Sequence, residues 1–259
     1  MALTPELATE WVDRWDAQQE RYVHDREERF AVLVDIVEEA VRDVAEPVVV
    51  DLGCGPGSLA ARIAERVPRA RVVGVDADPL LLALARGRYG DLARWEEVDL
   101  ADDGWAAVLP GQVHATVSTT ALHWMQQDRL AGLYRTLAAR TVPGGVLANG
   151  DHLAVADGLD GPAGAVAAGR ERRSGVTGRE DWTAWWDAVL ADPRLGDLTV
   201  GRAARASASV QDATGASEHH HGSNVLSAAD HAGLLRDAGY AHAGVVWQHG
   251  EDTVVVGVR

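Results

Sequence analysis

The ten residues VVVDLGCGPG, at positions 48–57, constrain the fold more than any other stretch of the chain. An apolar run stops at Asp51 and enters a loop that has glycine at every second position, namely Gly53, Gly55 and Gly57. Glycine adopts positive φ angles and lets the backbone approach a ligand, because it has no Cβ atom. Apolar residues at helical spacing follow the loop. The pattern predicts a buried strand, a tight loop and a helix that together bind a nucleotide-like ligand.

The glycine spacing does not fit a dinucleotide. A dinucleotide fingerprint places its third small residue one position later, where this chain has Ser58, whereas the glycine here is Gly57. A carboxylate at Asp51 would repel a pyrophosphate at the helix N-terminus. It suits a ligand with an ammonium and a sulfonium group, such as S-adenosylmethionine.

The segment DLGCGPG at 51–57 resembles the first motif of the class I S-adenosylmethionine-dependent methyltransferases, of the small-molecule type similar to trans-aconitate and ubiquinone methyltransferases. The resemblance implies an α/β fold with a Rossmann-like seven-stranded sheet, parallel except for an antiparallel C-terminal strand, and flanked by helices. It also implies S-adenosylmethionine as cofactor, S-adenosylhomocysteine as product and a small-molecule acceptor with an O, N, S or C nucleophile. Asp51, Gly53, Gly55 and Gly57 are then cofactor-binding residues.

A second acid follows at a suitable distance. The run ARVVGVDADP at 70–79 predicts a strand that ends in Asp76. Because neighbouring parallel strands end at the same edge of the sheet, Asp76 is expected to accept the ribose hydroxyls, with Ala77 beside it. Asp78, before Pro79, is expected to cap the next helix. Capping is also the alternative role of Asp76.

A third strand, ARWEEVDL, ends in Asp99 and Leu100. In the family, residues at this place hold the adenine, so Asp99 would accept from the exocyclic amine and Leu100 would cover a ring face. The alternative for Asp99 is a solvated acid at a strand end.

The fourth strand, VHATVSTTALHW at 113–124, leads to the place where the methyl group would be transferred. Thr119 is a candidate contact for the amino-acid part of the cofactor. His123 is the candidate general base, because imidazole titrates near neutral pH, and His152 is a second choice. Capping or a core hydrogen bond is the alternative for His123. Trp124 either forms a wall of the substrate pocket or packs in the core.

The segment 5–45 reads as two amphipathic helices joined near residues 24 and 25. In related enzymes such an arm covers the cofactor as a lid. Tyr22 and Arg26 are then candidates to meet the methionine carboxylate, ahead of Arg29, since arginine makes bidentate contacts with carboxylates. A solvated helix face is the alternative.

We expect one domain overall, made of an N-terminal helical lid (1–46), a cofactor-binding core (47–153), an insertion (154–224) after a fifth strand at 144–153, and a C-terminal helix and strand hairpin (225–259). The insertion is expected to shape the acceptor pocket above the strand ends.

The insertion contains two further motifs. Trp182, Trp185 and Trp186 have helical spacing and so form a core face, with Trp186 the candidate for an aromatic substrate pocket. The tract Glu218–His221 is expected to bind no metal, because successive residues of an extended chain point to opposite sides. His220 is a candidate substrate-pocket residue.

Charge and composition exclude several functions. The formal net charge is -15 and no basic stripe occurs, so neither DNA nor RNA is an expected partner. No apolar stretch is long enough to span a membrane and no signal peptide precedes the helices, which predicts a cytoplasmic protein without a membrane partner. Lysine is absent, which excludes Schiff-base chemistry and a P-loop, and the arginine-rich composition is typical of a GC-rich bacterial genome. A homodimer, a non-catalytic cofactor-binding regulator and a nicotinamide-dependent oxidoreductase remain open.

Overall fold

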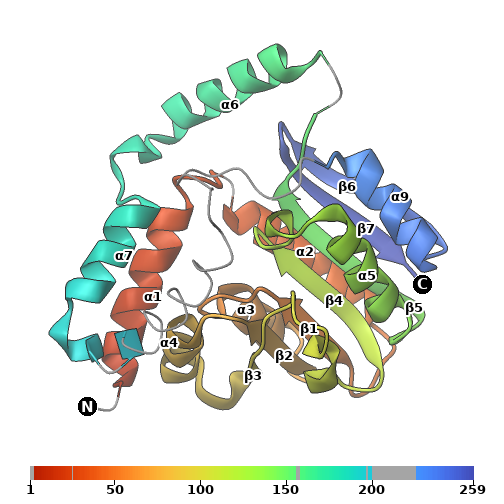
Figure 1. Ribbon diagram of the computed structural model, residues 1–259, viewed down its shortest axis with the longest axis horizontal. Helices are drawn as coiled ribbons and strands as arrows, with labels where there is room; N and C mark the ends of the chain where they lie inside the picture. The colour runs from red at the N-terminus through yellow and green to blue at the C-terminus, as the bar shows by residue number, and fades with distance from the viewer. Residues whose placement is uncertain (1–2, 25, 156–157, 197, 200–225) are drawn as a thin grey trace.

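The sheet determines where every candidate residue lies. The structure is a computed structural model that describes residues 3–24, 26–155, 158–196, 198–199 and 226–259 (Figure 1). Within these residues one seven-stranded sheet has the order β3-β2-β1-β4-β5-β7-β6. The strands are β1 (Val48–Leu52), β2 (Arg71–Asp76), β3 (Arg94–Glu97), β4 (Val113–Thr119), β5 (Thr141–His152), β6 (His242–His249) and β7 (Asp252–Val258). Strand β7 is antiparallel to both neighbours and the other pairs are parallel, which confirms the predicted topology.

Helices cover both faces of the sheet. Those of the described residues are α1 (Pro5–Gln19), α2 (Arg26–Ala40), α3 (Ser58–Arg66), α4 (Pro79–Tyr89), α5 (Gln127–Ala138), α6 (Asp160–Ser174), α7 (Trp182–Ala191) and α9 (Ala228–Ala238). One core layer contains Phe30 of α2, Ile63 of α3 and Leu82 of α4, while the opposite layer contains Leu133 of α5 and Leu235 of α9. Strands buried on both faces need continuous apolar runs, which explains the sequence of β1.

Local capping residues set the helix boundaries as predicted. The Asp78 side chain accepts hydrogen bonds from the backbone N–H groups of Leu80 and Leu81, and Pro79 begins α4. Ser227 and Asp230 form a capping box at the start of α9, and Gly239 ends that helix with φ +107°.

Three strand boundaries differ from the sequence prediction. Strand β5 begins at Thr141 rather than at 144, because Gly144, with φ +80°, continues the strand through an irregular register instead of forming a turn before it. Strand β3 ends at Glu97, which leaves Asp99 and Leu100 in the following loop. Strand β4 ends at Thr119, and a short 3₁₀ turn, Leu122–Trp124, follows.

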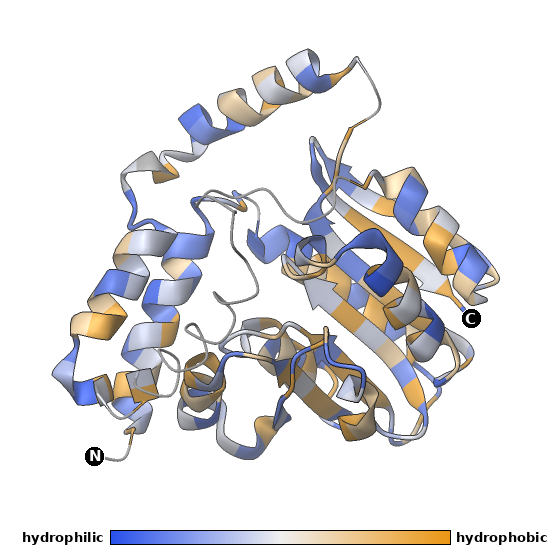
Figure 2. Ribbon diagram, viewed as in Figure 1, coloured by the Kyte–Doolittle hydropathy of each residue, from blue (hydrophilic) through white to orange (hydrophobic). Residues whose placement is uncertain are grey.

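A third cluster joins the N-terminal arm to the insertion. Trp11 of α1 packs against Leu80 and Leu84 of α4 and Trp185 of α7, so α1 and α7 lie side by side (Figure 1). Helix α6 extends away from the sheet and mixes polar and apolar residues along its length (Figure 2). None of the described helices is both long and apolar enough to cross a membrane.

Candidate cofactor and acceptor site

The glycine loop is held against two strands. Gly53, Gly55 and Gly57 have φ values of +66°, +54° and +87°, which a residue with a side chain rarely adopts. The backbone N–H of Gly53 donates to the carbonyl of Val75 in β2 at 2.8 Å. A Cβ atom on Gly53 would lie 2.3 Å from the Cβ atom of Ala121, just beyond β4. The loop therefore follows the ends of β1, β2 and β4 closely.

Gly57 has a packing role rather than a ligand-binding one. A Cβ atom on Gly57 would lie 2.5 Å from the ring of Trp95 in β3, and Gly57 does not line the cavity described below. The same ring would lie 2.7 Å from a Cβ atom on Gly74. This corrects the expected cofactor contact at Gly57: the third glycine makes room for an indole from a strand two positions away in the sheet.

Asp76 faces the ligand side of the loop. Its Oδ2 atom accepts from the backbone N–H of Gly55 at 2.7 Å, and its Oδ1 atom accepts from that of Asp78 at 2.8 Å. Burial raises the pKa of Asp76 to about 6, although these two hydrogen bonds oppose the increase. Each carboxylate oxygen can accept a second hydrogen bond. The loop thus fixes a carboxyl group that can receive two vicinal hydroxyls.

Asp51 lies behind the loop instead of in the cavity. Its side chain is fully buried in β1 and does not line the cavity. Burial raises the pKa of Asp51 to about 8, and the negative charge of Asp76 adds to the increase. The geometry gives no support to the expectation that this carboxyl meets an ammonium group, because β1 turns the side chain into the protein interior.

A cavity of about 510 Å³ opens beside the loop at the carboxyl ends of the parallel strands. Among the residues expected from sequence, those that line it are Gly53, Gly55, Asp76, Ala77, Asp99, Leu100, Thr119, Arg26 and Trp124. Asp99 also accepts a hydrogen bond from the backbone N–H of Ala101 at 2.8 Å, which fixes the loop after β3. The structure brings together acids, apolar side chains and one arginine from five separate segments, a set that fits a ligand with a ribose, an aromatic base and a carboxylate.

The sequence analysis missed several residues of the cavity wall. They are Trp15, Gln19, Phe30, Ala121, Met125 and Arg129. Two pairs among the helical residues, Trp15 with Gln19 and Arg26 with Phe30, are four positions apart. Residues at this spacing share one helix face, so the spacing could have indicated which face of the arm meets the ligand.

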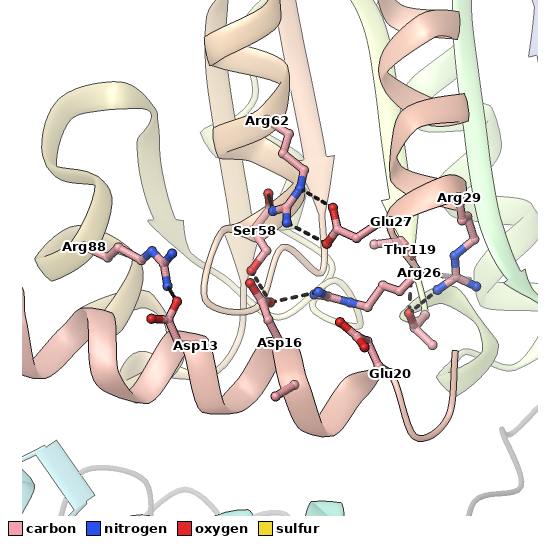
Figure 3. Close-up of polar contacts among 12 residues, drawn as sticks. Asp13, Asp16, Glu20, Arg26, Glu27, Arg29, Ser58, Arg62, Arg88 and Thr119 are labelled. Atoms are coloured by element: carbon pink, nitrogen blue, oxygen red, sulfur yellow. Dashed lines mark hydrogen bonds and ion pairs between the residues drawn. The ribbon is translucent and has the colours of Figure 1, made fainter. Parts of the chain in front are cut away.

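The arm is attached to the glycine loop through Asp16 (Figure 3). One carboxylate oxygen of Asp16 accepts from the hydroxyl of Ser58 at 2.6 Å and lies 2.9 Å from the guanidinium of Arg26. Burial lowers the pKa of Arg26, while Asp16 partly restores it. The Arg26 guanidinium also lies 4.3 Å from the centre of the Phe30 ring. Asp16 therefore connects α1, α2 and the start of α3 at the cavity edge.

Arg29 supports the site from behind and does not line the cavity. Its guanidinium is fully buried, lies 2.8 Å from Asp252 and donates to the hydroxyl of Thr120 at 2.9 Å. Thr120 has φ +53°, a strained value for a β-branched residue. A Cβ atom on Gly150 would lie 3.0 Å from Arg29, so this glycine leaves room for the arginine side chain. Arg29, which ranked behind Tyr22 and Arg26 as a candidate for the carboxylate of the ligand, is thus paired with Asp252 inside the protein.

Tyr22 and Trp186 also lie outside the cavity. The Tyr22 hydroxyl accepts from the backbone N–H of Trp182 at 3.0 Å, so it joins the arm to the start of α7. Trp186 is buried, and its ring packs edge-on against those of Trp15, Trp182 and Trp185. The structure therefore gives no support to the predicted ligand contact of Tyr22 or to the aromatic-pocket role of Trp186. The core-face interpretation of these tryptophans holds for Trp185 and Trp186.

His123 has a partner that the sequence analysis did not find. Its Nδ1 atom is 2.8 Å from Oδ1 of Asp151, a fully buried residue near the end of β5. The neighbouring Trp124 is 58% exposed on the cavity side. His152 is exposed, and it does not line the cavity. His123 does not line the cavity either, but Ala121 and Trp124 in the same segment do, and the contact with Asp151 distinguishes His123 from His152.

His220 and the rest of Glu218–His221 lie outside the described residues. Among the residues that the structure does describe, no group of three or more His, Cys, Asp or Glu side chains could hold a metal ion.

The sheet order, the antiparallel β7, the glycine loop and the acids after β2 and β3 define a class I S-adenosylmethionine-dependent methyltransferase fold. Residues 49–145 match the family described as "Methyltransferase domain". Residues 49–145 are therefore similar to a methyltransferase domain, within a fold that solved methyltransferases share.

Relatives agree with this assignment. Trans-aconitate 2-methyltransferase of Streptomyces avermitilis is 38% identical over 141 residues, 53% of this chain and 50% of the relative. The Azoarcus sp. protein of the same name is 37% identical over 134 residues, 52% and 49% of the two chains. The chain spans about half the length of these curated relatives. Human N-acetylserotonin methyltransferase, solved in complex with SAM, shares the fold with a TM-score of 0.52 at 15% identity, over 93% of this chain and 56% of that one.

Proposed function

We propose that this protein transfers the methyl group of S-adenosylmethionine to a small-molecule acceptor and releases S-adenosylhomocysteine. The observation that carries the proposal is the Asp76 carboxyl, which the Gly55 and Asp78 N–H groups fix on the wall of a cavity beside the glycine loop. The sulfonium group of the cofactor supplies an activated methyl group. The protein then has to hold the two reactants aligned and keep water away.

Different residues of the cavity are proposed to bind different parts of the cofactor. Asp76 is proposed to accept the two ribose hydroxyls, and Asp99 and Leu100 to hold the adenine. Arg26 is proposed to bind the methionine carboxylate, with Thr119 at the same end of the cavity. Arginine and a carboxylate make strong charge-assisted hydrogen bonds, and among the acids of the arm that the structure describes, Asp16 is the one that forms an ion pair with Arg26. Helices α1 and α2 would cover the bound cofactor as a lid.

The acceptor is proposed to enter beside Trp124 and His123, beyond the end of β4. A net charge of -15 disfavours a nucleic-acid acceptor, whose phosphates would be repelled. The two relatives are bacterial and act on trans-aconitate by name, which makes small metabolites the first acceptors to examine. We also propose bacterial specialised metabolism as the setting of the reaction; the relatives and the lysine-free composition support the bacterial source alone.

Calorimetric titration with S-adenosylhomocysteine and with NAD⁺ tests the cofactor. We expect the purified protein to bind the first and not the second, and Asp76→Ala to lose at least tenfold in affinity, since hydrogen bonds to a charged group contribute about 1.5–3 kcal/mol. Exposed Asp91→Asn is the control. Transfer of labelled methyl into a small-molecule extract of the source organism then separates an enzyme from a binding protein. Binding without any transfer would favour the regulator.

A further inference from the structure

His123 and Asp151 form a pair beside the segment that ends β4, although neither side chain lines the cavity itself. His123 belongs to the 3₁₀ turn after β4, and Asp151 to the adjacent strand β5. Their Nδ1 and Oδ1 atoms are 2.8 Å apart, with the Asp151 side chain fully buried and that of His123 21% exposed. Ala121 and Trp124, on either side of this histidine, line the cavity. The imidazole is thus paired with a buried carboxylate and belongs to a turn whose other residues form part of the cavity wall.

The carboxylate determines which nitrogen of His123 carries the proton. Burial alone would raise the pKa of Asp151, but the hydrogen bond and charge of His123 hold it below its ordinary value. An ionised carboxylate only accepts hydrogen bonds, so Nδ1 of His123 must be the donor. In the neutral ring Nε2 then keeps a lone pair. Nε2 makes no hydrogen bond with any residue in the described part of the chain.

Polar and charged groups of neighbouring elements surround Asp151, although its Oδ2 atom accepts no hydrogen bond from the described residues. Arg29 of α2 and His152 of β5 stabilise its charge, while the ring of Trp124 lies 4.8 Å from that of His123. On the opposite layer, the Tyr134 hydroxyl of α5 is 2.8 Å from Nδ1 of His231 in α9, and both residues feel the charge of Asp151. A buried carboxylate is costly unless it is paired, so its placement behind one imidazole favours a role in the chemistry.

We propose that Asp151 positions His123 as a general base and that the acceptor group is therefore a hydroxyl rather than a carboxylate. The inference rests on the methyl transfer proposed above. A carboxylate is already ionised at neutral pH and gives a base nothing to remove, whereas a hydroxyl must lose its proton as it reacts. The acceptor oxygen forms the bond to the methyl carbon, the sulfur–methyl bond breaks, and its electron pair stays on sulfur. The hydroxyl proton goes to Nε2 of His123 and from there to solvent.

The tautomer of His123 tests the positioning role without any acceptor. Long-range ¹H–¹⁵N correlation spectra of the wild-type protein are expected to show His123 protonated on Nδ1 and unprotonated on Nε2. Asp151→Asn is expected to lose this preference, because an amide can also donate. His123→Gln assigns the signal. A wild-type ring protonated on Nε2 overturns the proposal, and this readout stands even where the variant does not fold.

The product tests the acceptor class. Protein, methyl-labelled cofactor and the small-molecule extract are incubated, and the labelled product is treated first with mild alkali and then with hydriodic acid. A methyl ether is expected, which resists alkali and releases labelled methyl iodide in the acid. Label released as methanol by alkali indicates an ester and overturns the proposal, as does label resistant to both treatments. Cofactor binding without labelling of any product counts against the proposed function instead.

Turnover separates positioning from a structural role. Asp151→Asn is expected to lower labelling by about 10²-fold or more, the usual contribution of a general base, and to leave affinity for S-adenosylhomocysteine within twofold. Activity of the variant should recover as the pH rises toward the pKa of the acceptor hydroxyl, because the base is then dispensable. Loss of cofactor affinity in parallel with activity, without recovery at high pH, would mean that Asp151 only supports the fold.

Discussion

The guanidinium of Arg29, in α2, lies 2.8 Å from the carboxylate of Asp252, at the start of β7, and both side chains are almost completely buried. The pair connects the N-terminal arm to the last strand of the chain. Through its other nitrogen, Arg29 also holds the hydroxyl of Thr120, the residue with the strained backbone on the cavity wall. One side chain therefore links the stability of the fold to the shape of the site.

Replacing Arg29 by methionine should lower the free energy of unfolding by about 3–5 kcal/mol, because it leaves the Asp252 carboxylate buried without its cation. Chemical denaturation measures this change, and Arg29→Met combined with Asp252→Asn should recover a large part of it. Arg42→Met, which removes an exposed ion pair with Glu39, is the matched control and should have little effect. Equal effects of the two arginine substitutions would contradict the assigned role of Arg29.

Arg26→Met should weaken binding of S-adenosylhomocysteine by about tenfold or more, since it removes a charge-assisted hydrogen bond to the carboxylate. Binding of 5′-methylthioadenosine, which has the adenine and ribose but lacks the amino acid, should change little. Calorimetry with both ligands makes the comparison within one variant. A parallel loss for both ligands would show that Arg26 acts through the arm and not on the carboxylate.

Affinity for S-adenosylhomocysteine should rise with pH as Asp76 ionises. The pKa of Asp76 in the free protein is raised to about 6, and an ionised carboxylate accepts the ribose hydroxyls better than a protonated one. Binding therefore releases a proton at low pH, and the affinity should increase by about tenfold between pH 5 and pH 7. Titrations in buffers of that range measure it. In Asp76→Asn the affinity should be low at every pH, and a rise of the same size there would assign the titration to another group.

The ring of Trp95 leaves room only for glycine at positions 57 and 74. We expect alanine substitutions at these two positions to respond differently when Trp95 is replaced by a smaller residue. Gly74→Ala and Gly57→Ala should each lower the free energy of unfolding by about 1–3 kcal/mol through overpacking against this ring. Adding Trp95→Leu should relieve much of the cost at Gly74. At Gly57 the left-handed φ of +87° keeps a penalty of about 1–2 kcal/mol. Thermal or urea denaturation of the two single and the two double variants measures these free energies of unfolding. Full rescue of Gly57→Ala by Trp95→Leu would exclude backbone strain at position 57.

Residues at the end of a strand, or directly after it, could be predicted from the sequence, because parallel strands end at one edge. Asp76, Ala77 and Thr119 are examples, and all three line the cavity. The seven-stranded sheet with an antiparallel C-terminal strand was likewise predicted, although only through the family resemblance of the glycine motif. The sequence alone therefore predicts which residues lie at the carboxyl ends of the strands.

Contacts between separate segments could not be predicted. Asp51 precedes the loop in sequence, yet the alternation of β1 turns it inward. Gly57 meets Trp95 only because β3 lies at the edge of the same half of the sheet. Asp151 meets His123 through the pairing of β4 with β5, in which Thr119 is level with Gly150. Such register depends on the whole sheet, and a single sequence contains no local signal for it.

The packing of α1 against α7 has a consequence for any exchange of acceptor specificity between relatives. Arg14 lies 2.6 Å from Glu180, and Trp11 donates its indole N–H to Asp192, so the two helices carry complementary side chains from distant parts of the chain. A chimera that imported residues 179–195 alone would bring a foreign surface against the native first helix. A functional chimera therefore has to exchange segments 3–24 and 179–195 together.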